Sequence, residues 1–389
     1  MAWIMATTSN HLRRGSGGEC ALVIGGGPAG LVAGLGLSHV CDKVTIVEKH
    51  PTFEPLGSAI VIHPNGKKAI LEICPELWND LEAAGLGMPN GGVMLPWWEL
   101  RDAAVQAVRK RENIELCTGE TFTTIEESEH GSSVRVRVTF QSGRDVSADF
   151  LVGADGVHSA VRKWLQLPDP VPTGNTYFRG HITITDSCSP EMKSLLDKGA
   201  EPFARRYDGT FFTMMTFNDT HAGRMAWNII TTKEVDESTS PLDLLGGEAE
   251  PKDFALLQEI FDLSPPKSLI PFPRSSIIDV SDEVLQKYGG GWGGRGRITL
   301  VGDAAHAMRA IDGQGGNQAL EDAVILYRTF LSHQGDKSIE ERLRLFESTR
   351  LPRVKQIHHE QQTRYDQFMS GEHLAPYVGE NKHWVWDGV

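Results

Sequence analysis

The hydrophobic positions of the chain follow two main patterns, and each pattern predicts a different kind of element. Short aliphatic runs, which are typical of strands buried on both faces, lead into turns rich in glycine or acidic residues. Apolar residues at helical spacing follow several of these runs, so buried strands and helices alternate as in an α/β fold. The expected buried strands are 21–24, 43–47, 149–153 and 297–301, and the expected helices are 67–77, 97–111, 254–261 and most of 317–369.

Other runs have the alternation of strands with one exposed face. Residues 133–140 alternate strictly between polar and apolar side chains, and Gln141–Arg144 is typical of a hairpin turn. Residues 85–96 are rich in glycine and proline, which favours a loop. Mainly antiparallel strands inside an α/β chain suggest a separate sheet that holds a substrate. The short β-like runs that predict this sheet are 181–184, 211–215 and 225–230.

The first aliphatic run leads into a glycine-rich turn and then into a segment with helical spacing. Gly25 allows a tight turn, Gly27 lets the backbone approach a pyrophosphate, and Gly30 allows the helix to pack closely on the strand. The helix N-terminus offers free N–H groups to phosphates. Glu48 follows about twenty residues later, at the end of the next expected strand, where a carboxylate can accept hydrogen bonds from a ribose. The pattern predicts a site for an adenine dinucleotide, either FAD or NAD.

Two later segments also combine a strand end with an acidic residue and glycine. The run 149–153 leads into Asp155–Gly156, although this dipeptide alone is equally typical of an ordinary turn. The run 297–301 leads into Gly302–Asp303, and a helix is expected from Asn317 after a second cluster of glycines. Two helix N-termini with glycine-lined approaches suit an extended ligand that is held at both ends.

Composition narrows the classes of partner and location. The net charge of −13 makes nucleic acid and anionic membranes unfavourable partners, and no apolar run is long enough to serve as a membrane anchor. The 5 cysteines are scattered without a C-x-x-C pair, which is typical of a reducing compartment, so we expect a cytoplasmic protein. The length of 389 residues predicts two domains, which can be interleaved. No residue cluster indicates a metal site, and we expect His358–His359 to lie on a solvated helix face.

With these motifs in place, the chain resembles the group A flavoprotein monooxygenases of the para-hydroxybenzoate hydroxylase fold, near their salicylate-hydroxylase-like members. The matching stretches are Gly25–Gly30 with Glu48, Asp155–Gly156 with Arg162, and Gly302–Asp303 through Asp322. The resemblance implies a Rossmann-like, glutathione-reductase-type FAD-binding domain interleaved with an α+β substrate domain that carries a mainly antiparallel sheet. The implied segments are 19–85, 97–167 and 276–330 for FAD, 86–96 for a loop to the substrate side, 168–275 for the substrate sheet and 331–389 for C-terminal helices.

The resemblance also assigns roles to single residues near the adenosine and pyrophosphate. Glu48 would bind the adenosine ribose of FAD, and Ala59 would meet the cofactor in the flavin loop. Asp155 would lie near the pyrophosphates of both FAD and the nicotinamide cofactor.

A second set of implied roles concerns the flavin ring. Asp303 would bind the ribityl chain, and Gly315, Gly316 and Asn317 would present backbone N–H groups to the isoalloxazine. A helix N-terminus at that position stabilises the anionic reduced flavin, which agrees with the implied chemistry.

The chain departs from the family pattern at two places. Many members carry an arginine in an R-x-[DE]-L motif that contacts the FAD pyrophosphate, whereas Trp97 stands at that place here. We expect Arg101, one helical turn later on the same face, to supply the positive charge. The loop after His306 usually carries a proline that faces the flavin, and this chain has Ala310 within Arg309–Asp312 instead. The second departure puts the rigidity of this loop in question.

Arg179 and Tyr207 are the candidates for catalytic contact with the substrate, because both belong to the expected substrate sheet. Some relatives with phenolic substrates use an arginine and a tyrosine at such places. An arginine can hold a phenolate or a carboxylate by charge-assisted hydrogen bonds. The structural alternative is a surface arginine and a core tyrosine.

The implied activity is FAD-dependent hydroxylation or epoxidation of an aromatic or polycyclic small molecule, in secondary metabolism or aromatic catabolism. NAD(P)H as co-substrate would reduce FAD, and a flavin C4a-hydroperoxide formed with O2 would transfer an oxygen atom. The protein must therefore exclude water and hold the ring near the flavin. Two alternatives are an oxidoreductase of the same fold without oxygen insertion and a non-enzymatic nucleotide-binding regulator. The substrate, the choice of NADH or NADPH and the oligomeric state stay open.

Overall fold

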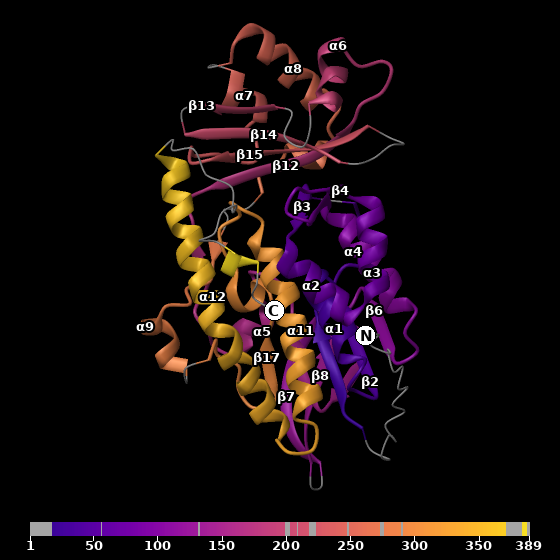
Figure 1. Ribbon diagram of the computed structural model, residues 1–389. Coiled ribbons are helices and arrows are strands. Elements are labelled where there is room, and N and C mark those ends of the chain that lie inside the picture. The colour runs from indigo at the N-terminus through magenta and orange to yellow at the C-terminus, as the bar shows by residue number, and fades with distance from the viewer. Residues whose placement is uncertain are drawn as a thin grey trace, which may run out of the picture.

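The computed structural model has an α/β part and a second sheet covered by helices, shown at the bottom and the top of Figure 1. The long helix α12 (Ile339–Met369) runs along one side and reaches from the first part to the second. The described residues are 18–55, 57–130, 133–198, 203–207, 209–217, 223–246, 249–272, 276–288, 291–370 and 383–386. This arrangement confirms the expected α/β class with a second, antiparallel sheet and C-terminal helices.

The α/β part is built on a parallel sheet of 5 strands in the order β17-β10-β1-β2-β6. Most of its side chains are buried on both faces, which is why these strands are nearly continuous aliphatic runs. Helix α1 is buried from Gly30 to Leu37 because it packs against both α4 and α11. The elements are β1 (Cys20–Ile24), β2 (Lys43–Glu48), β6 (Ile114–Thr118), β10 (Phe150–Gly153), β17 (Ile298–Leu300), α1 (Pro28–Leu37), α4 (Trp97–Arg109) and α11 (Gln314–Ser332).

A smaller antiparallel sheet, β7-β8-β9, extends from the α/β part. Val136 and Val138 of β8 are buried while Arg137 between them is exposed, so the expected alternation is present. Between the hairpin turn at 141–144 and Gly153 the chain forms two strands in different sheets, because β9 pairs with β8 and β10 pairs with β1. The chain changes sheet at Asp149, which donates its N–H to Cys20 O at 2.8 Å and accepts the Cys20 N–H on its carboxylate at 2.7 Å. The strands are β7 (Phe122–His130), β8 (Ser133–Phe140) and β9 (Asp145–Ala148).

The segment 86–96, expected to be a loop, contains two strands. β4 (Leu86–Gly87) and β3 (Ala59–Ile62) both pair with β5 (Val93–Pro96), whose apolar side chains are buried. Burial of these side chains outweighs the turn-forming composition of the segment.

The helix expected at 67–77 is two helices, α2 (Pro64–Ile73) and α3 (Pro75–Ala84). Pro75 has no N–H and cannot continue α2, so α2 ends at Ile73. Each proline instead takes the first position of its helix, where the N–H would have no partner within the helix.

The second sheet is antiparallel, with the order β12-β15-β14-β13. Its back face packs around Trp227 against helix α8 (Pro251–Asp262) and forms a separate core. Its front face turns toward the α/β part, because Met215 and Ala226 pack with Met94 of β5. The strands are β12 (Thr176–Thr183), β13 (Phe203–Tyr207), β14 (Thr210–Thr216) and β15 (Arg224–Thr231).

Short elements make the remaining connections, and β11 pairs antiparallel with β16 between the two parts. Helix α12 begins with a capping box formed by Ser338 and Glu341. No helix among the described residues is long and apolar enough to cross a membrane. The connecting elements are α5 (Ala160–Trp164), β11 (Val171–Pro172), α6 (Pro190–Lys193), η1 (Ser194–Asp197), α7 (Pro241–Gly246), η2 (Pro266–Leu269), β16 (Ser276–Ile277), α9 (Asp282–Leu285), η3 (Gln286–Tyr288), α10 (Asp303–His306) and η4 (His383–Val385).

Candidate functional site

Most of the expected binding residues lie at the carboxyl edge of the parallel sheet. Strand β2 ends at Glu48, and β1 leads directly into the glycine turn. Asp155 lies two residues after the end of β10, and Asp303 lies three residues after the end of β17. These strands are parallel neighbours, so their carboxyl ends share one edge, and α/β proteins bind ligands in the crevice outside that edge. A Cβ atom at Gly302 would lie 2.9 Å from the Cβ of Ala29, so the turn after β17 reaches the start of α1.

The three glycines of the first turn have different surroundings. Gly25 has a φ of +119° and a side chain there would clash with the carbonyl of Ala154, while a side chain at Gly30 would clash with the carbonyl of Gly25. Around Gly27, no other atom of the described chain lies within 4 Å of the position that a Cβ would take. Gly27 is also the N-cap of α1, whose first N–H groups lie beside this open space. The turn therefore leaves room for an anion at Gly27.

Glu48 is fixed beside the glycine turn. Its Oε2 accepts the N–H of Gly26 at 2.7 Å, and its Oε1 accepts the N–H of His50 at 2.9 Å. An ionised carboxylate has about four lone-pair directions, so both oxygens can still accept hydroxyl donors such as those of a ribose.

The backbone of Asp155 lies next to the glycine turn, whereas its side chain forms hydrogen bonds with residues at the start of α5. Its Oδ1 accepts the Ser159 hydroxyl at 2.5 Å, and its Oδ2 accepts the Ala160 N–H at 2.7 Å. Ser159 in turn caps α5 by accepting the N–H of Arg162 at 2.8 Å. Burial raises the pKa of Asp155. The carboxylate thus stabilises the N-terminus of α5, and its proposed contact with pyrophosphates stays a prediction.

Asp303 of α10 and Arg179 of β12 come from different parts of the molecule and face each other electrostatically. Both side chains are accessible to solvent, and yet both are surrounded by protein. Burial raises the pKa of Asp303 and lowers the pKa of Arg179, and the charge of each residue partly offsets the shift of the other. The mutual influence of the two charges agrees with the front face of the second sheet turning toward the α/β part, which carries Asp303.

Helix α11 begins beside the same region. Gly313 is its N-cap and has a φ of +74°, a left-handed conformation that glycine adopts without strain. Gly315 and Gly316 lie in the first turn, whose N–H groups have no partner within the helix. A Cβ at Gly316 would lie 2.7 Å from Cδ1 of Ile60, so the start of α11 packs directly against β3.

Asn317 joins α11 to the end of β3. Its Oδ1 accepts the N–H of His63 at 2.8 Å, and its Nδ2 donates to the carbonyl of Val61 at 2.8 Å. The side chain of Asn317 is therefore a structural link, while its backbone remains in the first turn of α11. Ala59, at the other end of β3, packs with the front face of the upper sheet, so β3 lies between the two parts.

Arg101 lies on α4 and is only 6% exposed. Its guanidinium lies over the rings of Phe53 and Trp97, at 5.1 and 5.4 Å from their centroids. Its Nη2 donates to Asp102 at 2.9 Å. The structure thus places a buried cation where Trp97 replaces the family arginine, and its contact with a pyrophosphate stays a prediction.

The register of the second sheet, β12-β15-β14-β13, adds two residues to the candidate site that the sequence did not predict. Arg179 pairs with Asn228, and Asn228 pairs with Thr213. Directly paired residues point to the same face, so the three form a polar row across the front face. The guanidinium of Arg179 also lies over the ring of Phe272, at 3.8 Å from its centroid. The sequence held no signal for this row, since the register between distant strands is decided only by tertiary structure.

Tyr207 lies on the opposite face of the same sheet, so the two residues predicted to contact the substrate do not share a face. Thr213, in the row of Arg179, pairs with Ala204, so the front face of β13 carries Ala204 and the back face carries Tyr207. Tyr207 packs against the core beneath α8. For Tyr207 the alternative of a core tyrosine therefore holds.

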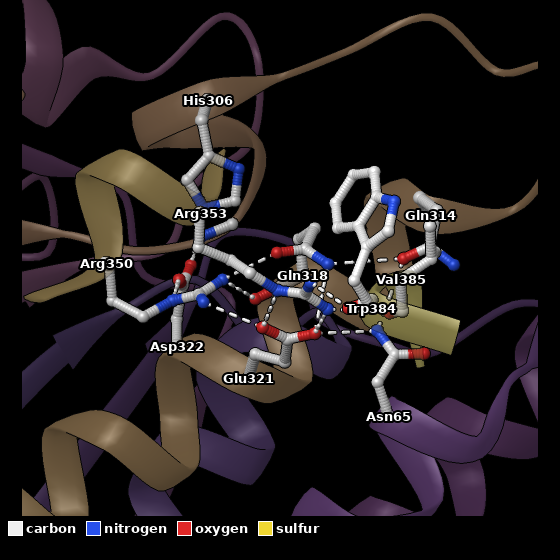
Figure 2. A network of polar contacts seen from close by, with 11 residues as sticks. Asn65, His306, Gln314, Gln318, Glu321, Asp322, Arg350, Arg353, Trp384 and Val385 are labelled. Carbon is white, nitrogen blue, oxygen red and sulfur yellow. Dashed lines mark hydrogen bonds and ion pairs between the residues drawn. The ribbon is translucent and has the colours of Figure 1, made fainter. Parts of the chain in front are cut away.

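A buried network of charged residues lies behind the turn that carries Asp303 (Figure 2). Asp322 accepts the N–H of Gly302 at 2.7 Å, Nε2 of His306 at 2.6 Å and Nε of Arg350 at 2.8 Å. Burial opposes ionisation of this carboxyl, but the charges of His306 and Arg350 hold the pKa of Asp322 below its usual value. His306 is therefore part of the support of the turn.

The network continues to the C-terminal segment 383–386. Arg350 donates to Glu321 at 2.7 Å, and Glu321 also accepts Arg353 at 2.8 Å. Arg353 donates to the carbonyls of Trp384 and Val385, each at 2.6 Å (Figure 2). Chain segments far apart in sequence are thus fixed to the start of α11.

The geometry can now be compared with known proteins. Residues 78–361, well over half of the chain, match the family model described as FAD binding domain. The chain belongs to this family of FAD-binding proteins. The residues of the carboxyl edge fit the cofactor, because the open space at Gly27, the fixed carboxylate of Glu48 and the side chain of Asp303 all follow the carboxyl ends of strands in one parallel sheet.

Relatives of the chain are monooxygenases or hydroxylases by name. The chain is 24% identical to 6-methylsalicylate 1-monooxygenase atA of Aspergillus terreus, over 86% of this chain and 80% of that protein. It is 25% identical to salicylate hydroxylase of Pseudomonas putida, over 94% of this chain and 91% of that protein. The solved structure of CtdE in complex with FAD and a substrate has a TM-score of 0.75 at 18% identity and 95% coverage of both chains, which shows the shared fold. The expected resemblance to salicylate-hydroxylase-like FAD monooxygenases is confirmed.

Proposed function

We propose that this FAD-binding protein is a monooxygenase that uses NAD(P)H and O2 to hydroxylate an anionic aromatic small molecule. The observation that carries the proposal is Arg179, a cation in the polar row on the front face of the second sheet, which turns toward the α/β part that carries Asp303. A guanidinium can hold a carboxylate or a phenolate by charge-assisted hydrogen bonds. Relatives named for salicylate and methylsalicylate, which are phenols that carry a carboxylate, support the same class of substrate.

Several residues would hold FAD in this site. Gly27 and the N-terminus of α1 would receive the pyrophosphate, Glu48 the adenosine ribose, and Asp303 the ribityl chain. Gly315 and Gly316 would present the free N–H groups of α11 to the flavin ring. Bound FAD, once reduced, supplies the activation of O2.

The reaction balances as ArH + O2 + NAD(P)H + H⁺ → ArOH + NAD(P)⁺ + H2O. A carbon–hydrogen bond of the ring is replaced by a carbon–oxygen bond. Two electrons from NAD(P)H and two protons convert the second oxygen atom to water. Tight positioning of the ring favours this outcome over release of peroxide.

The chain's own residues would orient the substrate. Arg179 would fix the anionic group, and Asn228 and Thr213 in the same row would bind a neighbouring hydroxyl or amino group. Met215 and Met94 close one side of the front face with apolar surface, which limits the access of water.

The test is the oxidation of NADPH and NADH in air by the FAD-loaded protein, with a panel of hydroxybenzoates and matched neutral phenols. We expect one anionic aromatic to accelerate oxidation, and labelled O2 to deliver one oxygen atom to the product. Flavin reduction without incorporation of labelled oxygen would favour an oxidoreductase that inserts no oxygen. Absence of FAD binding would contradict the proposal altogether.

Replacement of Arg179 by glutamine tests the substrate contact. We expect Arg179→Gln to raise KM about 10- to 100-fold, because a hydrogen bond to a charged group contributes about 1.5–3 kcal/mol. The matched control is Arg205→Gln, on the back face, where Arg205 pairs with Asp253 at 2.6 Å. An unchanged KM for the anionic substrate in Arg179→Gln would show that the substrate is held elsewhere.

A further inference from the structure

The loop at 307–313 connects α10 to α11 and lacks the proline that the family usually carries there. Its neighbours are Asp303 and the first turn of α11, so its conformation fixes the distance between two parts of the flavin site. The loop begins in an apolar cluster, where Met308 packs with Ile357 and Val385. Its other end depends on polar contacts with α12.

Asp312 makes most of these polar contacts. Its Oδ1 accepts Nε2 of Gln361 at 2.7 Å, and its Oδ2 lies 3.4 Å from Nε of Arg364. The side chains of Asp312 and Arg364 are only 5% and 8% exposed. A loop carboxylate with this degree of burial is held by two side chains that are one helical turn apart on α12.

The backbone of Asp312 is fixed as well. Its carbonyl accepts Nε2 of His63 at 3.0 Å, and His63 stacks on Trp386 with ring centroids 6.4 Å apart. Since His63 also donates its backbone N–H to Asn317, one residue joins the loop to the first turn of α11.

Helix α12 holds the start of this region too. Nε2 of His358 donates to the carbonyl of His306 at 3.1 Å, because a carbonyl can only accept. Burial lowers the pKa of His358 to about 4, so its ring is neutral near neutral pH. His358 is therefore partly buried against the loop, in contrast to the solvated helix face expected from the sequence, while His359 is exposed.

From these contacts we propose that Asp312 is a positioning residue for the flavin, and that Gln361 and Arg364 of α12 hold it. The family's usual proline restricts the loop through its own backbone, whereas this chain would restrict it from outside through a buried carboxylate. This inference rests on the proposed function for its consequence in turnover. Its consequence for the bound flavin depends only on FAD binding.

The test compares Asp312→Ala, Gln361→Ala and the double variant with wild type. The control is Gln367→Ala, since Gln367 lies on the same helix and is exposed. The first readout is the affinity of the apoprotein for FAD by flavin fluorescence, and the second is the visible circular dichroism of the bound flavin. We expect both single variants to weaken FAD binding about tenfold and to change the flavin dichroism. The double variant should bind FAD about as tightly as either single variant, because both substitutions remove the same interaction.

Asp312→Asn separates positioning from general stability. The asparagine side chain keeps a carbonyl oxygen that can accept the hydrogen bond from Gln361. Compared with Asp312→Ala, we therefore expect Asp312→Asn to have most of the wild-type FAD affinity and the wild-type dichroism. The ratio of product formed to NAD(P)H consumed should fall in Asp312→Ala and recover in Asp312→Asn.

Two outcomes would overturn the inference. The first is wild-type FAD affinity and dichroism in both alanine variants, and the second is an equal loss in Gln367→Ala. If wild type inserts no oxygen into any substrate, the proposed function fails, but affinity and dichroism still decide the role of Asp312.

Discussion

Gly25, Gly27 and Gly30 belong to one sequence motif, but their surroundings differ, so the reason for glycine is different at each position. Gly25 needs its positive φ of +119°, and Gly30 needs the close approach of its helix to the turn. Gly27 needs neither, because a Cβ there would meet open space. The fold therefore does not require glycine at this position, and we predict that the approach of a ligand requires it.

The two positions Gly27 and Gly30 form a matched pair for mutation. We expect Gly27→Ala to leave the melting temperature of the apoprotein nearly unchanged and to weaken FAD binding at least tenfold, because the methyl group occupies the approach to the pyrophosphate. Gly30→Ala should lower the melting temperature, since its Cβ would clash with the carbonyl of Gly25. Thermal melts and FAD titration of both variants check this. Wild-type FAD affinity in Gly27→Ala would contradict the assignment.

At the scale of elements, the junction of β17 and α12 contains the buried carboxyl of Glu347. Glu347 accepts Thr299 at 2.7 Å and Arg344 at 2.9 Å. Burial outweighs these contacts and raises the pKa of Glu347 from 4.5 to about 7. The packing of α12 on β17 is thus linked to pH.

Between pH 4.5 and about 7 the folded protein keeps a proton on Glu347 that the unfolded chain has lost, so its contribution to stability falls as pH rises. A shift of this size corresponds to at most roughly 3 kcal/mol. We expect Glu347→Gln to remove this part of the pH dependence of the free energy of unfolding. Denaturant unfolding of both proteins at pH 5 and pH 7.5 measures it, and parallel pH profiles would contradict the assignment.

At the scale of the whole molecule, one buried network joins three regions. Asp322 supports the turn before Asp303, Glu321 lies on α11, and Arg350 and Arg353 bring α12 and the segment 383–386 to them (Figure 2). Arg350 is 2% exposed, and the charges of Asp322 and Glu321 keep its pKa raised despite burial. The network therefore connects the C-terminal segment 383–386 to the turn before Asp303, at the carboxyl edge of the parallel sheet.

Removal of one charge from this network should be costly. We expect Arg350→Met to lower the free energy of unfolding by about 3–5 kcal/mol, because two buried carboxylates lose their shared partner. The surface variant Arg328→Met, which breaks a pair with the half-exposed Glu72, should cost at most about 1 kcal/mol. Denaturant unfolding of both variants makes the comparison. Equal losses would show that burial of the network contributes little.

Local sequence patterns predicted the turns that lie at the carboxyl edge of the parallel sheet. The glycine turn, Glu48 and the two later acidic turns were visible because a strand end, a glycine and an acid follow one another in the chain. The sequence did not predict the break between α2 and α3, which a single residue, Pro75, causes. It also did not predict the strands within 86–96, because burial of their side chains decides them.

The amino-acid sequence by itself determined the α/β class and the FAD-binding family, because these depend on short-range patterns of burial and turn chemistry. Only the tertiary structure decided which residues share a face of the second sheet. Arg179 stands in one row with Asn228 and Thr213, and Tyr207 lies on the opposite face, because strand register sets the face of every side chain. The support of Asp312 by Gln361 likewise spans 49 residues, a contact that no local pattern contains.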